Sequence, residues 1–445
     1  MLRWFVLGWA LLAASGCTSY GVIQNTSQSD GVPGPSYSII NVYGKHAAND
    51  TTLFLTFSGG GTRAAALAYG VLQELRDTRV VIDGESRPLL DYVSVISSVS
   101  GGSFTAAYYG LFGDRIFTDF ERRFLRKNVS GTLFWRLFHP SRWFSSASRT
   151  EMAVEYLQET LFGKASFLDM RLREGPMILI NASDLSSGAR ISFIQEYFNL
   201  LCSDVDSFPV AKAVAASSAV PIVFDPVVLE NYSGCNTGPY LEALRRTKEN
   251  ATSPQALQAV TSLEKLVVDK EQLRYLHLVD GGITDNLGLR TFNEVIELYG
   301  GMGAFLQKLG RRPSRNSAII VVDASTEPGY GIAASRKVPT IEQTIGAVTD
   351  IQLHRYNATT LELMQRSLKR WSDELAESDD PVETRLIEVN LREFGSPEQQ
   401  RMVNEIPTNY YLDETQVGVM IEAGRTLLRM NPDFQAFLES LKGNQ

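Results

Sequence analysis

Two stretches near the start of the chain repeat one pattern: an apolar run, a glycine turn, and an alanine-rich segment without proline. The first combines the run Leu53–Phe57 with the turn Gly59–Gly61, and the second combines Tyr92–Ile96 with Ser100–Gly102. This order predicts a strand, a tight turn and a helix, formed twice. Each turn would leave backbone N–H groups and the positive end of a helix facing one point, which suits an anion. The second turn also places Ser100 beside that point.

The composition is that of a globular chain, long enough for one extended α/β unit or for two domains. Its 445 residues are 44% hydrophobic and 21% charged, and no segment repeats at a fixed period. The formal net charge of −8 leaves no basic excess to neutralise phosphates, which argues against nucleic acid as the main partner.

Residues 1–16 have the form of an export signal. Arg3 precedes an apolar run, Trp4–Ala14, which is shorter than the roughly 20 residues that a bilayer-spanning helix needs. The sequence Leu-Ala-Ala-Ser-Gly-Cys that ends at Cys17 resembles the lipobox of bacterial lipoproteins, with alanine where leucine is commoner. The resemblance implies cleavage before Cys17, acylation of that cysteine and a cell-envelope location. Thr18 in place of aspartate favours the outer membrane over the inner one. The alternative is an ordinary secretory signal with a chance cysteine.

Residues 17–45 are rich in small and polar side chains, which predicts a flexible tether between the lipid anchor and the folded body. The remaining cysteines, Cys202 and Cys235, would then lie in an oxidising compartment. A disulfide between them would add about 3 kcal/mol of stability. Two unpaired buried thiols are the other possibility, and the sequence leaves both open.

Ser100 lies in Ser-Val-Ser-Gly-Gly, which is the nucleophile elbow Gly-x-Ser-x-Gly with Ser98 in place of the first glycine. Such an elbow holds the serine in a strained turn and exposes its Oγ above the sheet edge. Gly102 removes a side chain that would block the approach of the following helix. The triplet Gly59–Gly61 is not a P-loop, because no Gly-Lys-Ser/Thr follows it. Its N–H groups could still cradle an anion, and Arg63 adds a positive charge.

A serine nucleophile needs a base, and the best-placed candidate is an aspartate. Asp280 ends an apolar strand and is followed by two glycines, so its carboxylate could reach another strand-end residue. The simpler interpretation is that Asp280 caps a turn. Asp184 and Asp323 also close apolar strands but lack the paired glycines. No triad pattern surrounds any of the histidines, which are His46, His139, His277 and His354.

Taken in order, Gly-Gly-Gly-x-Arg at 59–63, the Ser100 elbow and Asp-Gly-Gly at 280–282 resemble the patatin-like phospholipase family. Two further blocks agree with it. Residues 214–226 resemble that family's Ala-Ser-x-Ala-x-Pro segment, and residues 177–185 resemble the strand between these blocks. The resemblance implies an α/β three-layer fold with a mostly parallel central sheet and helices on both faces.

The same resemblance implies a Ser–Asp dyad, with Ser100 as the nucleophile and Asp280 as its base. The reaction would be acyl transfer through an acyl-serine, completed by water, on a membrane phospholipid or lysophospholipid. It needs no cofactor, and no metal-ligand spacing appears. Hydrolysis of small esters or thioesters, or a non-enzymatic lipoprotein that binds lipid or protein, remain alternatives. The N–H groups expected to hold the oxyanion are those of Gly59, Gly60, Gly61 and Gly101.

The sequence predicts an acyl hydrolase domain over residues 46–395 and a C-terminal helical extension over 396–445. A long helix is expected over 350–375, and two helices over 414–441, broken at Asn431-Pro432. The segment 115–149 mixes aromatic and basic residues. It is either a cap facing lipid or a helical insertion packed on the core.

Overall fold

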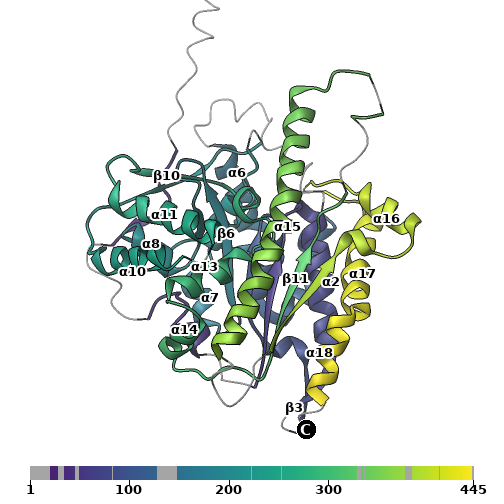
Figure 1. The fold of residues 1–445 in the computed structure, drawn as a ribbon. Coiled ribbons are helices and arrows are strands. Elements are labelled where there is room, and N and C mark those ends of the chain that lie inside the picture. Colours follow the sequence, from purple (N-terminus) through teal and green to yellow (C-terminus); the bar gives the residue numbers. More distant parts are fainter. Residues whose placement is uncertain are drawn as a thin grey trace, which may run out of the picture.

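The structure, a computed structural model, is built around an eight-stranded sheet (Figure 1). It describes residues 21–28, 35–45, 50–82, 84–127, 148–221, 223–251, 253–327, 332–334, 336–375, 383–409 and 411–442.

The sheet has the strand order β12-β11-β2-β5-β6-β10-β9, and β7 pairs with β6 off this path. The first five strands of this order run parallel to one another, whereas β10, β9 and β7 join by antiparallel pairing. The mostly parallel sheet expected from the sequence is therefore confirmed. The strands are β2 (Thr51–Phe57), β5 (Val93–Val99), β6 (Met177–Asp184), β7 (Arg190–Ser192), β9 (Val227–Glu230), β10 (Tyr275–Asp280), β11 (Asn316–Asp323) and β12 (Glu383–Asn390).

Two short pairs lie outside the main sheet, β1 (Thr26–Ser27) with β8 (Ser203–Asp204) and β3 (Arg79–Ile82) with β4 (Glu85–Pro88). The α-helices are α2 (Gly61–Asp77), α3 (Gly101–Phe112), α4 (Ile116–Phe120), α6 (Arg149–Leu157), α7 (Phe167–Leu172), α8 (Gln195–Leu200), α9 (Val210–Ser217), α10 (Gly238–Glu249), α11 (Pro254–Val268), α12 (Gly282–Asp285), α13 (Arg290–Leu298), α14 (Met302–Leu309), α15 (Ile341–Leu375), α16 (Pro397–Asn404), α17 (Glu414–Met430) and α18 (Pro432–Lys442).

Helices cover both faces of the sheet, as two side chains of β2 show. Side chains alternate between the faces of a strand, so Phe54 and Phe57 point to opposite sides. The ring of Phe54 packs edge-on against Phe292 of α13, with 5.6 Å between ring centroids. Phe57 lies against the start of α3, where a Cβ on Gly102 would come within 2.6 Å of the Phe57 Cβ. Because both faces are covered, β6 is buried along its whole length.

The C-terminal helices pack on the helix that follows the first glycine turn. α17 lies along α2 (Figure 1). The two backbones meet at glycines. A Cβ on Gly70 would lie 2.1 Å from the carbonyl oxygen of Ile421, and one on Gly424 would lie 2.3 Å from that of Leu67. The expected helical segment at 350–375 forms the C-terminal part of α15, and the expected break at Asn431-Pro432 separates α17 from α18.

Part of the segment expected to be a flexible tether belongs instead to the folded body. In 21–28, β1 pairs with β8, and the side-chain amide of Asn25 donates to Ser203 Oγ at 2.9 Å. In 35–45, Tyr37 is fully buried and its hydroxyl donates to the carbonyl of Ile178 at 3.0 Å. The polar composition predicted a tether, but hydrogen bonds to residues far along the chain hold these pieces. The export signal, Cys17 and residues 128–147 of the aromatic-basic segment lie outside the described residues.

Candidate active site

Ser100 occupies the turn between β5 and α3 in a strained backbone conformation. Its φ of 49° and ψ of −122° are backbone angles that residues other than glycine rarely adopt. The two following glycines allow this turn to sit close to its neighbours. A Cβ on Gly101 would lie 2.0 Å from the carbonyl oxygen of Gly61, and one on Gly102 would meet Phe57. The sequence Ser-Gly-Gly thus lets α3 begin directly against the first glycine turn.

Asp280 is hydrogen-bonded to this serine from the end of β10. The Ser100 hydroxyl donates to Asp280 Oδ2 at 2.6 Å, and the backbone N–H of Gly282 donates to Oδ1 at 2.8 Å. Gly281 has no room for a side chain, because a Cβ there would lie 2.3 Å from the carbonyl oxygen of Asn181. The paired glycines after Asp280 therefore turn the chain tightly beside β6 and aim an N–H at the carboxylate.

Asp280 is the last residue of β10, and its carboxylate reaches Ser100 just after the end of β5. β10 runs antiparallel to β6, with Asp280 opposite Ala182. The strand enters from the edge where β5 ends, and Asp280 is the point at which it stops beside Ser100. The two residues meet because two strands of opposite direction end close together.

Burial makes Asp280 a stronger base than a solvated aspartate. Removal from water raises its pKa from 3.8 to about 6, while the hydrogen bonds from Ser100 and Gly282 act in the opposite direction. A carboxylate with this pKa is mostly ionised at neutral pH and can accept a proton more readily than an exposed one.

The other acidic candidates contact different groups. Asp184 accepts the hydroxyl of Ser187 at 2.7 Å and the backbone N–H of His277 at 2.8 Å, so it caps the turn after β6. Asp323 accepts the N–H of Ser325 at 2.9 Å at the end of β11. Among the described residues, no histidine is hydrogen-bonded to Ser100; His46 and His139 lie outside them.

The first glycine turn lies beside Ser100, and its N–H groups differ in their availability. The N–H of Gly59 donates to the carbonyl of Asn286 at 3.0 Å, so Gly59 does not offer the free donor expected of it. Within the described ranges, the N–H groups of Gly60, Gly61 and Gly101 have no hydrogen-bond partner. The backbone needs glycine here, since φ is 136° at Gly60 and 60° at Gly61.

Arg63 supports this turn by holding a distant segment over it. Arg63 is 5% exposed, and its guanidinium donates from Nη1 to the carbonyl of Ile406 at 2.7 Å. One residue earlier, the N–H of Thr62 donates to the carbonyl of Asn409 at 2.8 Å. Burial lowers the pKa of Arg63 to about 10, with Asp350 and Asp323 opposing that change. The segment around 406–409 was not connected to the site by sequence reasoning.

Ser217, at the end of α9, is a further part of the site, and the sequence analysis did not single it out. Its Oγ accepts the N–H of Ser100 at 2.9 Å and donates to the carbonyl of Asn181 at 2.6 Å. The carbonyl of Ser217 also accepts the N–H of Gly281 at 3.1 Å. One residue thus connects the elbow, β6 and the turn after Asp280. The Ala-Ser-x-Ala-x-Pro block was the only signal for it.

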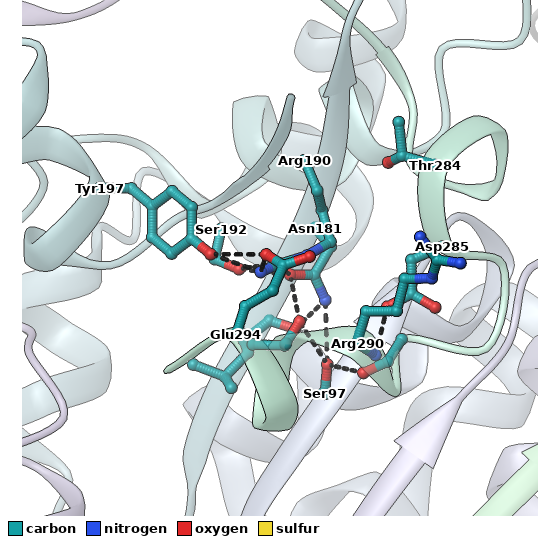
Figure 2. Close-up of polar contacts among 12 residues, drawn as sticks. Ser97, Asn181, Arg190, Ser192, Tyr197, Thr284, Asp285, Arg290 and Glu294 are labelled. Atoms are coloured by element: carbon teal, nitrogen blue, oxygen red, sulfur yellow. Dashed lines mark hydrogen bonds and ion pairs between the residues drawn. The ribbon is translucent and has the colours of Figure 1, made fainter. Parts of the chain in front are cut away.

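Asn181 connects the elbow strand to a buried polar network under the site (Figure 2). Its amide donates to Ser97 Oγ at 3.0 Å on β5. Its Oδ1 accepts hydrogen bonds from Arg190 at 2.8 Å and from Thr291 at 3.0 Å. The guanidinium of Arg190 also pairs with Glu294. These bonds fix β5, β6, β7 and α13 relative to one another, and with them the strand that carries Ser100.

The two cysteines left open by the sequence are joined in the structure. Cys202 and Cys235 form a disulfide, and the N–H of Gln28 donates to the carbonyl of Cys202. This bond lies beside β1 and β8.

In the described part of the chain, no helix is long and apolar enough to cross a bilayer. Among the same residues, no group of three or more His, Cys, Asp or Glu side chains is arranged to hold a metal ion.

An α/β sheet that presents a strained serine, a buried carboxylate bonded to it and free N–H groups nearby has the arrangement that serine hydrolases use. Comparison with known proteins places the chain more narrowly. Residues 55–293 match the sequence model of the family described as patatin-like phospholipase. The chain therefore belongs to the patatin-like phospholipase family, as its motifs indicated.

The individual proteins that resemble this chain share little sequence identity with it. An uncharacterized protein of Bacillus subtilis, YqhO, is 26% identical over 185 residues, which cover 41% of this chain and 60% of that protein. Human GIVD cytosolic phospholipase A2 is a similar solved structure, with a TM-score of 0.48 and 12% identity, covering 96% of this chain and 66% of the human one. Its complex with a fluorophosphonate inhibitor gives a TM-score of 0.40 and 14% identity, over 92% and 63% of the two chains. The matches thus span less than two thirds of these proteins' own lengths.

Proposed function

We propose that this protein is a serine acyl hydrolase that cleaves acyl esters of phospholipids or lysophospholipids, with Ser100 and Asp280 as a catalytic dyad. The observation that carries the proposal is the 2.6 Å hydrogen bond from the Ser100 hydroxyl to a buried carboxylate, on a serine whose backbone is strained. Membership of the patatin-like phospholipase family supports the same conclusion.

The proposed reaction has two halves. In the first, Asp280 accepts the Ser100 proton as Oγ attacks the ester carbonyl, and the tetrahedral intermediate collapses with loss of the alcohol, which takes the proton from Asp280. In the second, water attacks the acyl-serine, giving its proton to Asp280, and the fatty acid leaves as Ser100 Oγ regains that proton. The free N–H groups of Gly60, Gly61 and Gly101 are the proposed donors to the oxyanion.

Aliphatic side chains beside the dyad favour a lipid over a small water-soluble ester. Val220 and Val223 are 40% and 50% exposed, and Ile283 is 48% exposed. Val220 follows Ala219, whose carbonyl accepts the N–H of Asp280, and Ile283 lies three residues after Asp280. Exposed aliphatic groups around a reactive serine are suited to contact acyl chains or a lipid surface.

The sequence around Cys17 supports a second proposal, that the mature protein is held at a bacterial membrane by lipid attached to this cysteine, at the outer membrane rather than the inner one. The N–H of Gln24, seven residues after Cys17, donates to the carbonyl of Val228 at 3.1 Å, and the chain spans at most about 3.6 Å per residue. An anchor at Cys17 would therefore hold the body close to the bilayer. Mass spectrometry of the protein from membranes tests this; an unmodified Cys17 peptide would overturn it.

Labelling with a fluorophosphonate probe tests the dyad. Wild-type protein should be labelled and Ser100→Ala should not, while Asp280→Asn should fold and lose nearly all turnover of a lysophospholipid. Activity confined to butyryl esters or thioesters would assign the alternative hydrolase classes. Folded protein that neither reacts with the probe nor hydrolyses any ester in lipid vesicles would indicate a binding lipoprotein.

A further inference from the structure

A cavity of about 110 Å³ lies between the sheet and helices α13, α14 and α15, at the edge opposite the dyad. Its strand residues come from the first halves of the strands, such as Thr52 in β2, Val95 in β5 and Thr384 in β12. Ser100 follows the last residue of β5, and these strands run parallel, so the cavity and the dyad occupy opposite edges. Figure 1 shows α14 next to the C-terminal half of α15, which forms the outer wall.

The wall of this cavity is largely aromatic and aliphatic. Phe54 packs against Phe292, and Tyr43 stacks on Phe305 with 6.3 Å between ring centroids. All four rings line the space. A cavity needs only about 10–15 Å³ to hold one water molecule. This one is several times larger, so it has room for an alkyl chain of several methylene groups.

The lining also carries two arginines and a buried N–H group that has no hydrogen-bond acceptor. The Arg311 guanidinium lies over the Tyr43 ring, 4.5 Å from its centroid. Arg312 is exposed, and its guanidinium has no hydrogen-bond or ion-pair partner within the described ranges. Trp371 is 3% exposed, and its indole Nε1–H is buried without a hydrogen-bond acceptor. A buried donor without an acceptor lowers stability, so a ligand that supplies one would be favoured.

We propose that this cavity binds a medium-chain fatty acid, with its alkyl chain between the sheet and α13 and its carboxylate beside Arg311 and Arg312. Apolar walls select a hydrocarbon chain, and the two cations select an anionic head over a neutral or cationic one. The site is separate from the dyad, so the proposal does not depend on the reaction assigned to Ser100.

Calorimetric titration of the full protein with decanoate tests this proposal. The Ser100→Ala variant is used, so that no acyl-enzyme forms. One decanoate should bind per chain and raise the melting temperature. Decanol should bind at least ten-fold more weakly because it lacks the charge, and butyrate should not bind measurably because it leaves the cavity unfilled.

Three variants locate the binding. Val295→Phe places a larger side chain into the cavity and should abolish binding, while Arg312→Gln should weaken it about five-fold or more. Lys308→Gln removes an exposed cation from α14 that does not line the cavity, and should leave binding unchanged. If Val295→Phe fails to fold, the comparison of decanoate binding by Arg312→Gln and Lys308→Gln still tests the site. The proposal is overturned if decanoate does not bind, if decanol binds equally well, or if Arg312→Gln and Lys308→Gln behave alike.

Discussion

The hydroxyl of Ser217 accepts the backbone N–H of Ser100 at 2.9 Å, and so fixes the peptide that carries the proposed nucleophile. The same hydroxyl donates to the carbonyl of Asn181 at 2.6 Å. Ser217 is therefore a positioning residue, since it reaches the elbow from a different helix without lying on the path of the proton between Ser100 and Asp280.

We predict that Ser217→Ala lowers kcat about 100-fold, because displacement of a reacting group by about 1 Å has an effect of that size. It should also lower the free energy of unfolding by about 2–4 kcal/mol, since two buried backbone groups lose their partner. The pH at which activity falls should not change, because Asp280 keeps its surroundings.

The matched control is Ser98→Ala. Ser98 is also buried, and its hydroxyl donates to the carbonyl of Leu179 at 3.1 Å on β6. Its replacement should reduce stability and leave kcat nearly unchanged. An equal loss of kcat in both variants would show that Ser217 acts only through general stability.

The strained backbone of Ser100 predicts a conflict between stability and activity. Ser100→Gly and Ser100→Ala both lose the hydrogen bond to Asp280, but only glycine adopts φ 49° without strain. The glycine variant should be more stable than the alanine variant by about 1–2 kcal/mol in urea unfolding, and both should be inactive. At Ser103, inside α3, the order should reverse, because glycine destabilises a helix. The same order at both positions would argue that the elbow is unstrained.

The raised pKa of Asp280 predicts how activity depends on pH. A base with a pKa of about 6 is lost to protonation below that pH, so kcat/KM for an uncharged ester should fall tenfold per pH unit there. A profile that is flat from pH 7 down to pH 4.5 would mean that Asp280 is not the base.

Whereas activity should rise with pH, the contribution of Asp280 to the stability of the folded protein should fall as pH rises. The folded-state pKa of Asp280 exceeds its usual 3.8, so the folded state binds more protons between pH 4 and pH 6, and stability falls as pH rises through that window. Asp280→Asn removes the buried charge, and should be more stable than wild type by about 3 kcal/mol at pH 8 and similar to it near pH 4. Asp285 and Glu196 also have raised pKa values, so only the difference between the two proteins isolates Asp280.

The glycines around Ser100 should differ in their tolerance of alanine. At Gly60 a Cβ would have its nearest atoms at 3.3 and 3.6 Å, so Gly60→Ala should fold, with a penalty of about 1–2 kcal/mol for its positive φ. At Gly101 a Cβ would lie 2.0 Å from the carbonyl oxygen of Gly61. Alanine at this position would therefore force the first glycine turn away from the elbow that carries Ser100. Gly101→Ala should therefore lose most of its stability, as melting curves would show.

A third glycine provides the control. Gly418 lies in α17 with nothing near its Cβ position, so Gly418→Ala should raise stability by about 0.5–1 kcal/mol. Equal stability of Gly60→Ala and Gly101→Ala would contradict the close approach of the two turns.

The local parts of the site were predictable from the sequence, whereas the long-range ones were not. Ser100 and Asp280 stand out because each is followed by glycines that its own turn requires. Ser217 contacts residues 117 and 36 positions away, and nothing local marks that contact. Tyr37 is similar: its neighbours are polar, but its hydroxyl bonds to Ile178, 141 residues away. The antiparallel direction of β10 was also invisible, because a strand's own residues do not specify its partner.

The disulfide between Cys202 and Cys235 predicts an effect on stability that is separate from the active site. It closes a loop with a sequence separation of 33, and such a loop contributes about 3 kcal/mol by restricting the unfolded chain. Replacing both cysteines by serine should lower the urea midpoint accordingly and leave kcat unchanged, since the bond lies beside β1 and β8 rather than beside Ser100. Dithiothreitol should have the same effect on wild type and none on the double variant. A loss of activity without a loss of stability would instead connect this region to the dyad.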